Sequence, residues 1–317
     1  MTELRHGSRS FYPRSLTTGG TRSLRFRVMK IFPILIAILL TALFTNAQAT
    51  PDAWTRTEAR LNALLARDSE QKRTALGEIR NLRTEQASRL ALPSLKDSDA
   101  IVRATAAAAV VFLPPAEAAA ALLPLLGDKE PFVRREAAYA LGKARSPAGV
   151  QGLISAIGND RDLEVRAAAA VALGNIGDPA GLDSLLAVLK KKPSDENEFL
   201  RRSAARSIGQ TFDALYGGDT YTVTPQNFLA PKFKDVEPGQ RPAGEPANIH
   251  LIIAELSRVL RSPKESADTR REAAFALGAI RRPTSSELLR SYLSSTDPYL
   301  AEISREAILK IGGNGQP

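Results

Sequence analysis

The chain repeats a pattern of about 32 residues, and this repeat restricts the possible folds more than any other feature of the sequence. Three consecutive units begin at Asp97, Asp128 and Asp160, and the arginines six residues after these aspartates are 31 and 32 residues apart. Internal repeats of this length are typical of helical stacks in which each unit contacts only its neighbours. The repeat therefore predicts a stack of similar units.

Each unit reads as two helices. In the second unit, apolar residues from Val133 to Leu141 recur at helical spacing and form one stripe. Gly142 and its counterpart Gly174 follow this stripe, where we expect a helix to end at a residue with positive φ. Pro147 then begins the second helix, because a missing N–H costs nothing in the first helical turn. A single pair cannot bury both of its apolar stripes, so the pairs must stack.

The same pattern extends in both directions along the chain. It predicts an all-α fold, an α-solenoid of about six to seven stacked helix pairs over residues 69–317. Residues 50–68 are expected to form a capping helix in front of the stack. Alanine is abundant and only 6% of the residues are aromatic, a composition that suits closely packed helices better than sheets.

Residues 1–49 have the organisation of a secretory signal peptide. A basic stretch precedes an uncharged apolar run at 31–44, and small residues occupy positions −3 and −1 of a cut after Ala49. A membrane anchor is the alternative, but the run is shorter than the roughly 20 apolar residues that a span needs. We expect a periplasmic or secreted protein with no stable membrane insertion after cleavage. Either Met1 or Met29 could be the first residue translated.

The charge and the residue types present exclude several classes of function. The formal net charge of +9 falls to +3 without the leader, so the body has little electrostatic reason to bind nucleic acid. The absence of cysteine excludes disulfides, thiolate metal sites and cysteine nucleophiles. The two histidines, His6 and His250, lie far apart in the sequence. We therefore predict no metal, no cofactor and no catalytic residue.

Four Asp–Arg pairs with a spacing of six residues are the first group of candidate site residues. We expect a structural ladder in which each Asp caps a first helix and each Arg reaches the Asp of a neighbouring repeat. A row of charged ligand-binding groups is the alternative. The pairs are Asp97 and Arg103, Asp128 and Arg134, Asp160 and Arg166, and Asp195 and Arg201.

A long interruption at 213–247 supplies the second group. This segment is rich in Pro and Gly but also contains aromatic residues, and loops of such length are usually functional or disordered. It is a partner-binding loop, a loop that packs on the stack, or a linker. The candidate binding residues in it and in the segment that follows are Tyr216, Tyr221, Phe228, Phe233, His250 and Arg258.

The Asp-x5-Arg spacing, followed by Ala-rich sequence and Leu-Gly, resembles the HEAT-like repeats first named in phycobilisome lyases, over roughly residues 69–312. The resemblance implies a helical solenoid, in a family whose members are mostly scaffolds or binding modules. A few members attach chromophores or bind iron. The iron-binding members use His-Glu dipeptides, and this sequence contains none.

These observations predict a non-catalytic extracytoplasmic scaffold or adaptor that binds protein or peptide partners. The second helices are expected to line the binding surface. Two alternatives are a lyase-type or other enzyme of the same family and a structural subunit of an envelope assembly. Fold resemblance alone does not choose among them.

Overall fold

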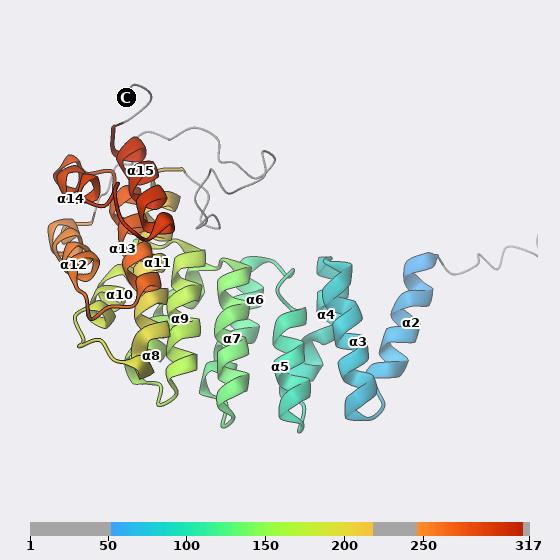
Figure 1. The fold of residues 1–317 in the computed structure, drawn as a ribbon. Helices are drawn as coiled ribbons and strands as arrows, with labels where there is room; N and C mark the ends of the chain where they lie inside the picture. Colours follow the sequence, from blue (N-terminus) through green and yellow to red (C-terminus); the bar gives the residue numbers. More distant parts are fainter. Residues whose placement is uncertain (1–51, 218–245, 313–317) are drawn as a thin grey trace, which may run out of the picture. The chain divides into compact units, whose positions relative to one another are not determined.

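The computed structural model describes residues 52–217 and 246–312, which from Ala53 onward form a stack of helices (Figure 1). Every regular element in these two stretches is an α-helix or a 3-10 helix. The prediction of an all-α solenoid is thereby confirmed. The signal peptide expected at 1–49 lies outside the described residues.

The stack begins at α2 (Ala53–Leu65), continues as six helix pairs in the described ranges, and reaches α15 (Pro298–Gly312). The first helices of the pairs are α3 (Ser69–Leu82), α5 (Ala100–Ala109), α7 (Pro131–Ala144), α9 (Leu163–Ile176), α11 (Glu198–Leu215) and α13 (Ala267–Ala279). The second helices are α4 (Glu85–Ala91), α6 (Pro115–Leu122), α8 (Val150–Asn159), α10 (Leu182–Leu189), α12 (Ile249–Arg261) and α14 (Ser286–Arg290). Short 3-10 helices adjoin these elements at η1 (Leu92–Lys96), η2 (Leu123–Gly127), η3 (Pro147–Gly149), η4 (Pro179–Gly181), η5 (Asp195–Asn197) and η8 (Pro283–Ser285).

The first helices pack on one another in chain order and form one layer, as α5, α7 and α9 show (Figure 1). From α5 onward each of them also packs on the second helix of the preceding pair, as α9 does on α8, so α9 is buried on several sides at Ala168, Ala170 and Ala172. A helix that is apolar on several sides is stable only when enclosed. The alanine-rich sequence is therefore a consequence of close packing in this layer.

Two glycines in the first helices do not have the conformation expected from the sequence. Gly142 and Gly174 lie inside α7 and α9, and positive φ occurs instead at Arg145 and Gly177, three residues later. A Cβ atom on Gly142 would lie 2.7 Å from Cα of Ala172 in the neighbouring first helix. The prediction of a helix end was therefore wrong, because these glycines permit close approach between helices.

A partly buried acid, Glu272, lies on α13 close to charged residues of α11. Burial raises the pKa of its carboxyl group to about 7, and the nearby Arg206 and Arg202 only partly offset this effect. Asp268 on the same helix raises the pKa further. The folded protein therefore holds a proton on Glu272 more tightly than the unfolded chain does.

Replacing Glu272 by Gln should remove one source of pH dependence. Because the pKa is raised on folding, Glu272 contributes stability below pH about 4.5 that is lost as the pH rises towards about 7. As the pH rises from 5 to 8, the free energy of unfolding of the Gln variant should increase by on the order of 2 kcal/mol relative to that of the wild type. Urea unfolding at both pH values measures this gain. The exposed Glu196→Gln variant is the control, and an equal response of both variants would contradict the assignment.

Candidate functional site

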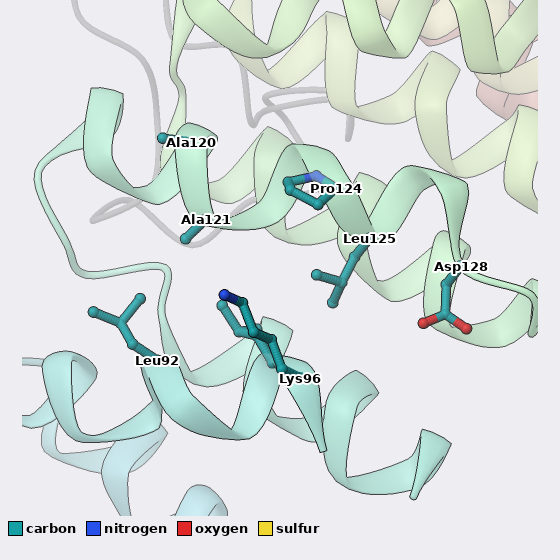
Figure 2. A pocket seen from close by; sticks show the side chains of 8 residues that line it. Leu92, Lys96, Ala120, Ala121, Pro124, Leu125 and Asp128 are labelled. Atoms are coloured by element: carbon teal, nitrogen blue, oxygen red, sulfur yellow. The ribbon is translucent and has the colours of Figure 1, made fainter. Parts of the chain in front are cut away.

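A groove of about 490 Å³ opens between the second helices of the first two pairs. This volume is within the range of pockets that hold small ligands. One side of the groove is formed by η1 and the other by α6 and η2 (Figure 2). Its lining is apolar except for one lysine and one aspartate, and consists of Leu92, Leu95, Lys96, Ala120, Ala121, Pro124, Leu125 and Asp128.

Two prolines shape the walls of this groove. Pro93 and Pro124 stand four residues before Asp97 and Asp128, within the first turns of η1 and η2. Proline has no N–H to donate to the α-helical ladder, so the chain changes there from an α-helix to a tighter 3-10 turn. In the third pair Ala156 occupies the matching position, and α8 continues unbroken to Asn159.

The next interface along the stack is closed where this one is open. There, Leu123 and Leu126 of η2 pack so close to α8 that a Cβ atom on Gly152 would lie 2.6 Å and 3.1 Å from their Cδ atoms. Ala120 stands eight residues before Asp128, as Gly152 stands eight before Asp160. At the open interface this position carries the methyl group of Ala120, which lines the groove.

Ion pairs connect the two sides of the groove near both of its ends. Arg89 of α4 donates to both carboxylate oxygens of Glu117 on α6, at 2.6 and 3.0 Å. At the other end, Arg103 donates to both oxygens of Asp128, at 2.7 and 2.9 Å. Hydrogen bonds from Arg103 lower the pKa of Asp128, so this carboxyl group is ionised at neutral pH.

Lys96 is the charged residue of the groove lining that has no acidic ion-pair partner among the described residues. Its side chain extends from η1 toward the facing helix, between Leu92 and Leu125 (Figure 2). It is exposed, and within the described ranges it forms no ion pair. The groove therefore combines an apolar surface with a single positive charge that a ligand can neutralise.

The described residues contain neither a metal-binding cluster nor a membrane-spanning helix. No group of three or more His, Cys, Asp or Glu side chains in 52–217 and 246–312 is arranged to hold a metal ion. Over the same two ranges, no helix has both the length and the apolar character needed to cross a bilayer.

The Asp–Arg residues singled out from the sequence form inter-repeat ion pairs in part of the stack. Arg103 pairs with Asp128, and Arg134 pairs with Asp160 through contacts of 2.7 and 2.8 Å. Lys72 extends the row by pairing with Asp97 at 2.6 Å. The carboxylates retain only 7–11% exposure, which suits a structural role better than ligand binding.

Two features of this row differ from the expected pattern. Asp160 is not the helix N-cap, because it accepts from the N–H of Asp162, and Asp162 itself caps α9. Arg166 does not reach Asp195; it donates to the carbonyl of Ile157 at 2.7 Å. Asp195 lies exposed in η5, where the longer connection between α10 and α11 moves it out of register.

Arg201, the last arginine predicted for the row, pairs with Glu265, a residue 64 positions later. Glu265 stands in the loop before α13, where earlier units place an aspartate before their first helix. The insertion between α11 and α12 hides this relation in the sequence. Further along, Arg271 pairs with Asp297 at 2.8 and 3.0 Å.

Asp160→Ala should destabilise the protein by about 1–3 kcal/mol, because it removes a turn-stabilising acceptor and leaves Arg134 without its counter-ion. Asp195→Ala should change stability by less than about 0.5 kcal/mol, because this exposed residue lies outside the row. Thermal unfolding of both variants measures the difference. Equal melting temperatures would show that the ion pairs of the row contribute no stability.

The aromatic and basic candidates do not gather into one site. Tyr216 is 1% exposed, stacks on Phe212 and lies under the guanidinium of Arg281. It is therefore a packing residue, and its proposed role as a partner-binding anchor was wrong. The segment expected as a loop from residue 213 is helical to residue 215, because this turn of α11 is buried against the stack.

The remaining candidates lie on α12 or outside the described residues. His250 is exposed in the first turn of α12, and Arg258 donates to Glu255 and to the carbonyl of Leu189 at 3.0 Å. Helix α12 belongs to the fifth pair, whereas the groove lies between the first and second pairs. The aromatic residues outside the described ranges are Tyr221, Phe228 and Phe233.

Comparisons with known proteins identify the repeats. The family model described as HEAT repeats matches residues 57–140 and 119–209, and the model described as PBS lyase HEAT-like repeat matches 269–295. These matches confirm the resemblance drawn from the sequence. No curated protein matches the chain.

Several solved structures are similar to this chain at low sequence identity. The karyopherin Kap121p, bound to the extreme C-terminus of the protein phosphatase Cdc14p, is 15% identical with a TM-score of 0.51; the match covers 89% of this chain and 32% of Kap121p. The CpcE–CpcF complex of a Nostoc phycocyanin lyase is 18% identical with a TM-score of 0.44, covering 84% and 97%. Human deoxyhypusine hydroxylase in complex with glycerol is 18% identical with a TM-score of 0.34, covering 83% and 99%.

These structures overturn the prediction that the chain is not an enzyme. The structures similar to this chain include subunits of a phycocyanin lyase and a deoxyhypusine hydroxylase. The prediction relied on the scarcity of histidine and cysteine, which excludes some catalytic chemistries but not an enzyme in general. At these TM-scores, neither match assigns an activity to this chain.

Proposed function

We propose that this chain, which belongs to the family of HEAT-repeat proteins, is an adaptor that binds protein or peptide partners after export from the cytoplasm. The observation that carries the proposal is the apolar groove between the first and second pairs. This space between two repeats is open, whereas the interface between the second and third pairs is closed by leucine side chains. Apolar pockets with a few convergent polar groups are the usual form of binding sites.

The fold supports a peptide or protein as the occupant. A helical stack presents a long surface to which an extended segment can bind along several repeats. In the Kap121p structure a stack of this kind is bound to the C-terminus of another protein. The near-neutral charge of the body favours a protein partner over nucleic acid.

Export is supported by the sequence of residues 1–49. We expect the mature protein to begin at Thr50, after the small residues that precede the predicted cleavage point. N-terminal sequencing of the protein from the envelope or culture medium of its own cell measures this. Intact protein with residues 31–44 in the membrane fraction would contradict cleavage.

Position-specific photo-cross-linking tests the binding proposal. The photoreactive amino acid benzoylphenylalanine, placed at Ala121 on the wall of the groove, should cross-link a small, reproducible set of proteins in the living cell. The matched control is Gln151, an exposed residue on the second helix of the third pair. Cross-links of equal yield at both positions, or none at Ala121, would contradict binding at the groove.

A further inference from the structure

We infer that the groove is selective for an extended peptide segment in which an apolar side chain is followed, two positions later, by Asp or Glu, with Lys96 binding the carboxylate. This inference rests on the proposed function and specifies the class of partner. It follows from the charges of the groove, its length and the type of hydrogen-bond donor that it offers.

The charges at the groove leave only one position for an additional acid. The guanidinium of Arg89 already forms ion pairs with Glu117 and Glu85. The guanidinium of Arg103 already forms an ion pair with Asp128. Lys96 has no such partner in the part of the chain that the structure describes. An acidic ligand therefore gains one ion pair without breaking an existing one, whereas a basic ligand meets uncompensated positive charge.

The length of the groove limits the segment that contacts it. From Arg89 to Lys96 the chain rises about 1.5 Å per residue to the end of α4 and about 2.0 Å per residue through η1, roughly 12 Å in all. An extended chain that rises about 3.3 Å per residue covers this length with three to four residues.

The spacing within the segment follows from the same geometry. Leu92 lies four residues before Lys96 in the 3-10 helix η1, a separation of roughly 8 Å along its axis. In an extended chain, residues i and i+2 point to the same side and are separated by about 6.6 Å. An apolar side chain against Leu92 and Ala121 therefore places the side chain two positions later within reach of Lys96, whose flexible stem spans the small difference in length.

The donor at the groove favours an internal acidic side chain over a chain terminus. Terminal carboxylates are bound by sets of backbone N–H groups. Pro124 lines this groove and Pro93 lies in η1, which forms the opposite wall, and proline has no N–H to donate. A single ammonium on a flexible stem suits the carboxylate of an Asp or Glu side chain.

Selection from a displayed library of random hexapeptides, flanked on both sides by Gly-Ser, tests the inference. Wild-type protein should enrich sequences with an apolar residue followed two positions later by Asp or Glu. Changing that acid to its amide should weaken binding at least tenfold. Lys96→Glu should reverse the preference toward Lys and Arg, and Lys96→Met should abolish it while retaining the apolar requirement.

Lys143→Glu, at an exposed position of α7, provides a control with the same change of charge and should select as wild type does. Enrichment without an acidic preference, the same preference in the Lys96→Glu variant, or no enriched peptide would each overturn the inference. Circular dichroism verifies that the Lys96 variants are folded. If cross-linking at Ala121 succeeds while the acidic preference fails, the proposed function stands and only the class of partner is wrong.

Discussion

Glu265→Ala should destabilise the folded protein by about 3–5 kcal/mol, more than any other single change considered for this chain. Glu265 and Arg201 are 2% and 1% exposed, and both carboxylate oxygens accept hydrogen bonds from the guanidinium. Truncating the acid leaves a buried positive charge whose remaining acceptors are backbone carbonyls, including those of Val188 and Leu189. Urea unfolding monitored by circular dichroism measures the loss.

The exposed ion pair between Arg60 and Glu78 supplies a matched control, with side chains 54% and 39% exposed. Glu78→Ala should cost less than about 1 kcal/mol, since exposed pairs contribute little. Replacing the buried pair together, by Arg201→Met and Glu265→Leu, should recover much of the stability lost in the single variant. If the Glu265→Ala and Glu78→Ala variants were equally stable, burial of the ion pair would not increase the stability lost on truncating its acid.

Gly142→Val should destabilise the protein by about 3 kcal/mol, because the first helices approach each other too closely at this position to admit a side chain. The added Cβ would lie 2.7 Å from Cα and 2.9 Å from Cβ of Ala172. One of these contacts is with backbone, so α7 and α9 must separate to relieve it. Chemical denaturation at constant pH measures the change in the free energy of unfolding.

Gly77→Val tests the same substitution where nothing lies within 4 Å of the added Cβ. Gly77 also lies in a first helix, α3, so the helix propensities change equally in the two variants. We expect a change of less than about 0.5 kcal/mol at Gly77. Similar losses at both positions would indicate a general intolerance of the first helices to valine instead of a close helix contact.

The sequence was sufficient to predict the architecture because each unit carries its own local signals. The Asp-x5-Arg spacing, the alanine-rich first helices and Pro147 at the start of a second helix are all short-range features. The role of Gly142 was misassigned, since a glycine near the end of a helical pattern fits both a helix end and a close contact. Only the position of Ala172 in the neighbouring helix distinguishes the two.

The groove could not be predicted from local signals alone, although a trace of it is present in the sequence. Pro93 and Pro124 stand where the third unit has Ala156, a difference that marks altered second helices. Whether such a change opens a groove depends on how the next pair packs, as the contrast between Ala120 and Gly152 shows. The pairing of Arg201 with Glu265 was hidden for a related reason, because the insertion separates partners that the stack brings together.

Binding of a partner protein at the groove between the first and second pairs is tested by filling the groove with Ala121→Trp. The affinity of this variant is measured for the partner identified by cross-linking. We expect calorimetry to show at least a tenfold loss of affinity, about 1.4 kcal/mol, while Gln151→Trp on the third pair binds as wild type does. Unchanged affinity of the folded Ala121→Trp variant would place the binding surface elsewhere and contradict binding at the groove.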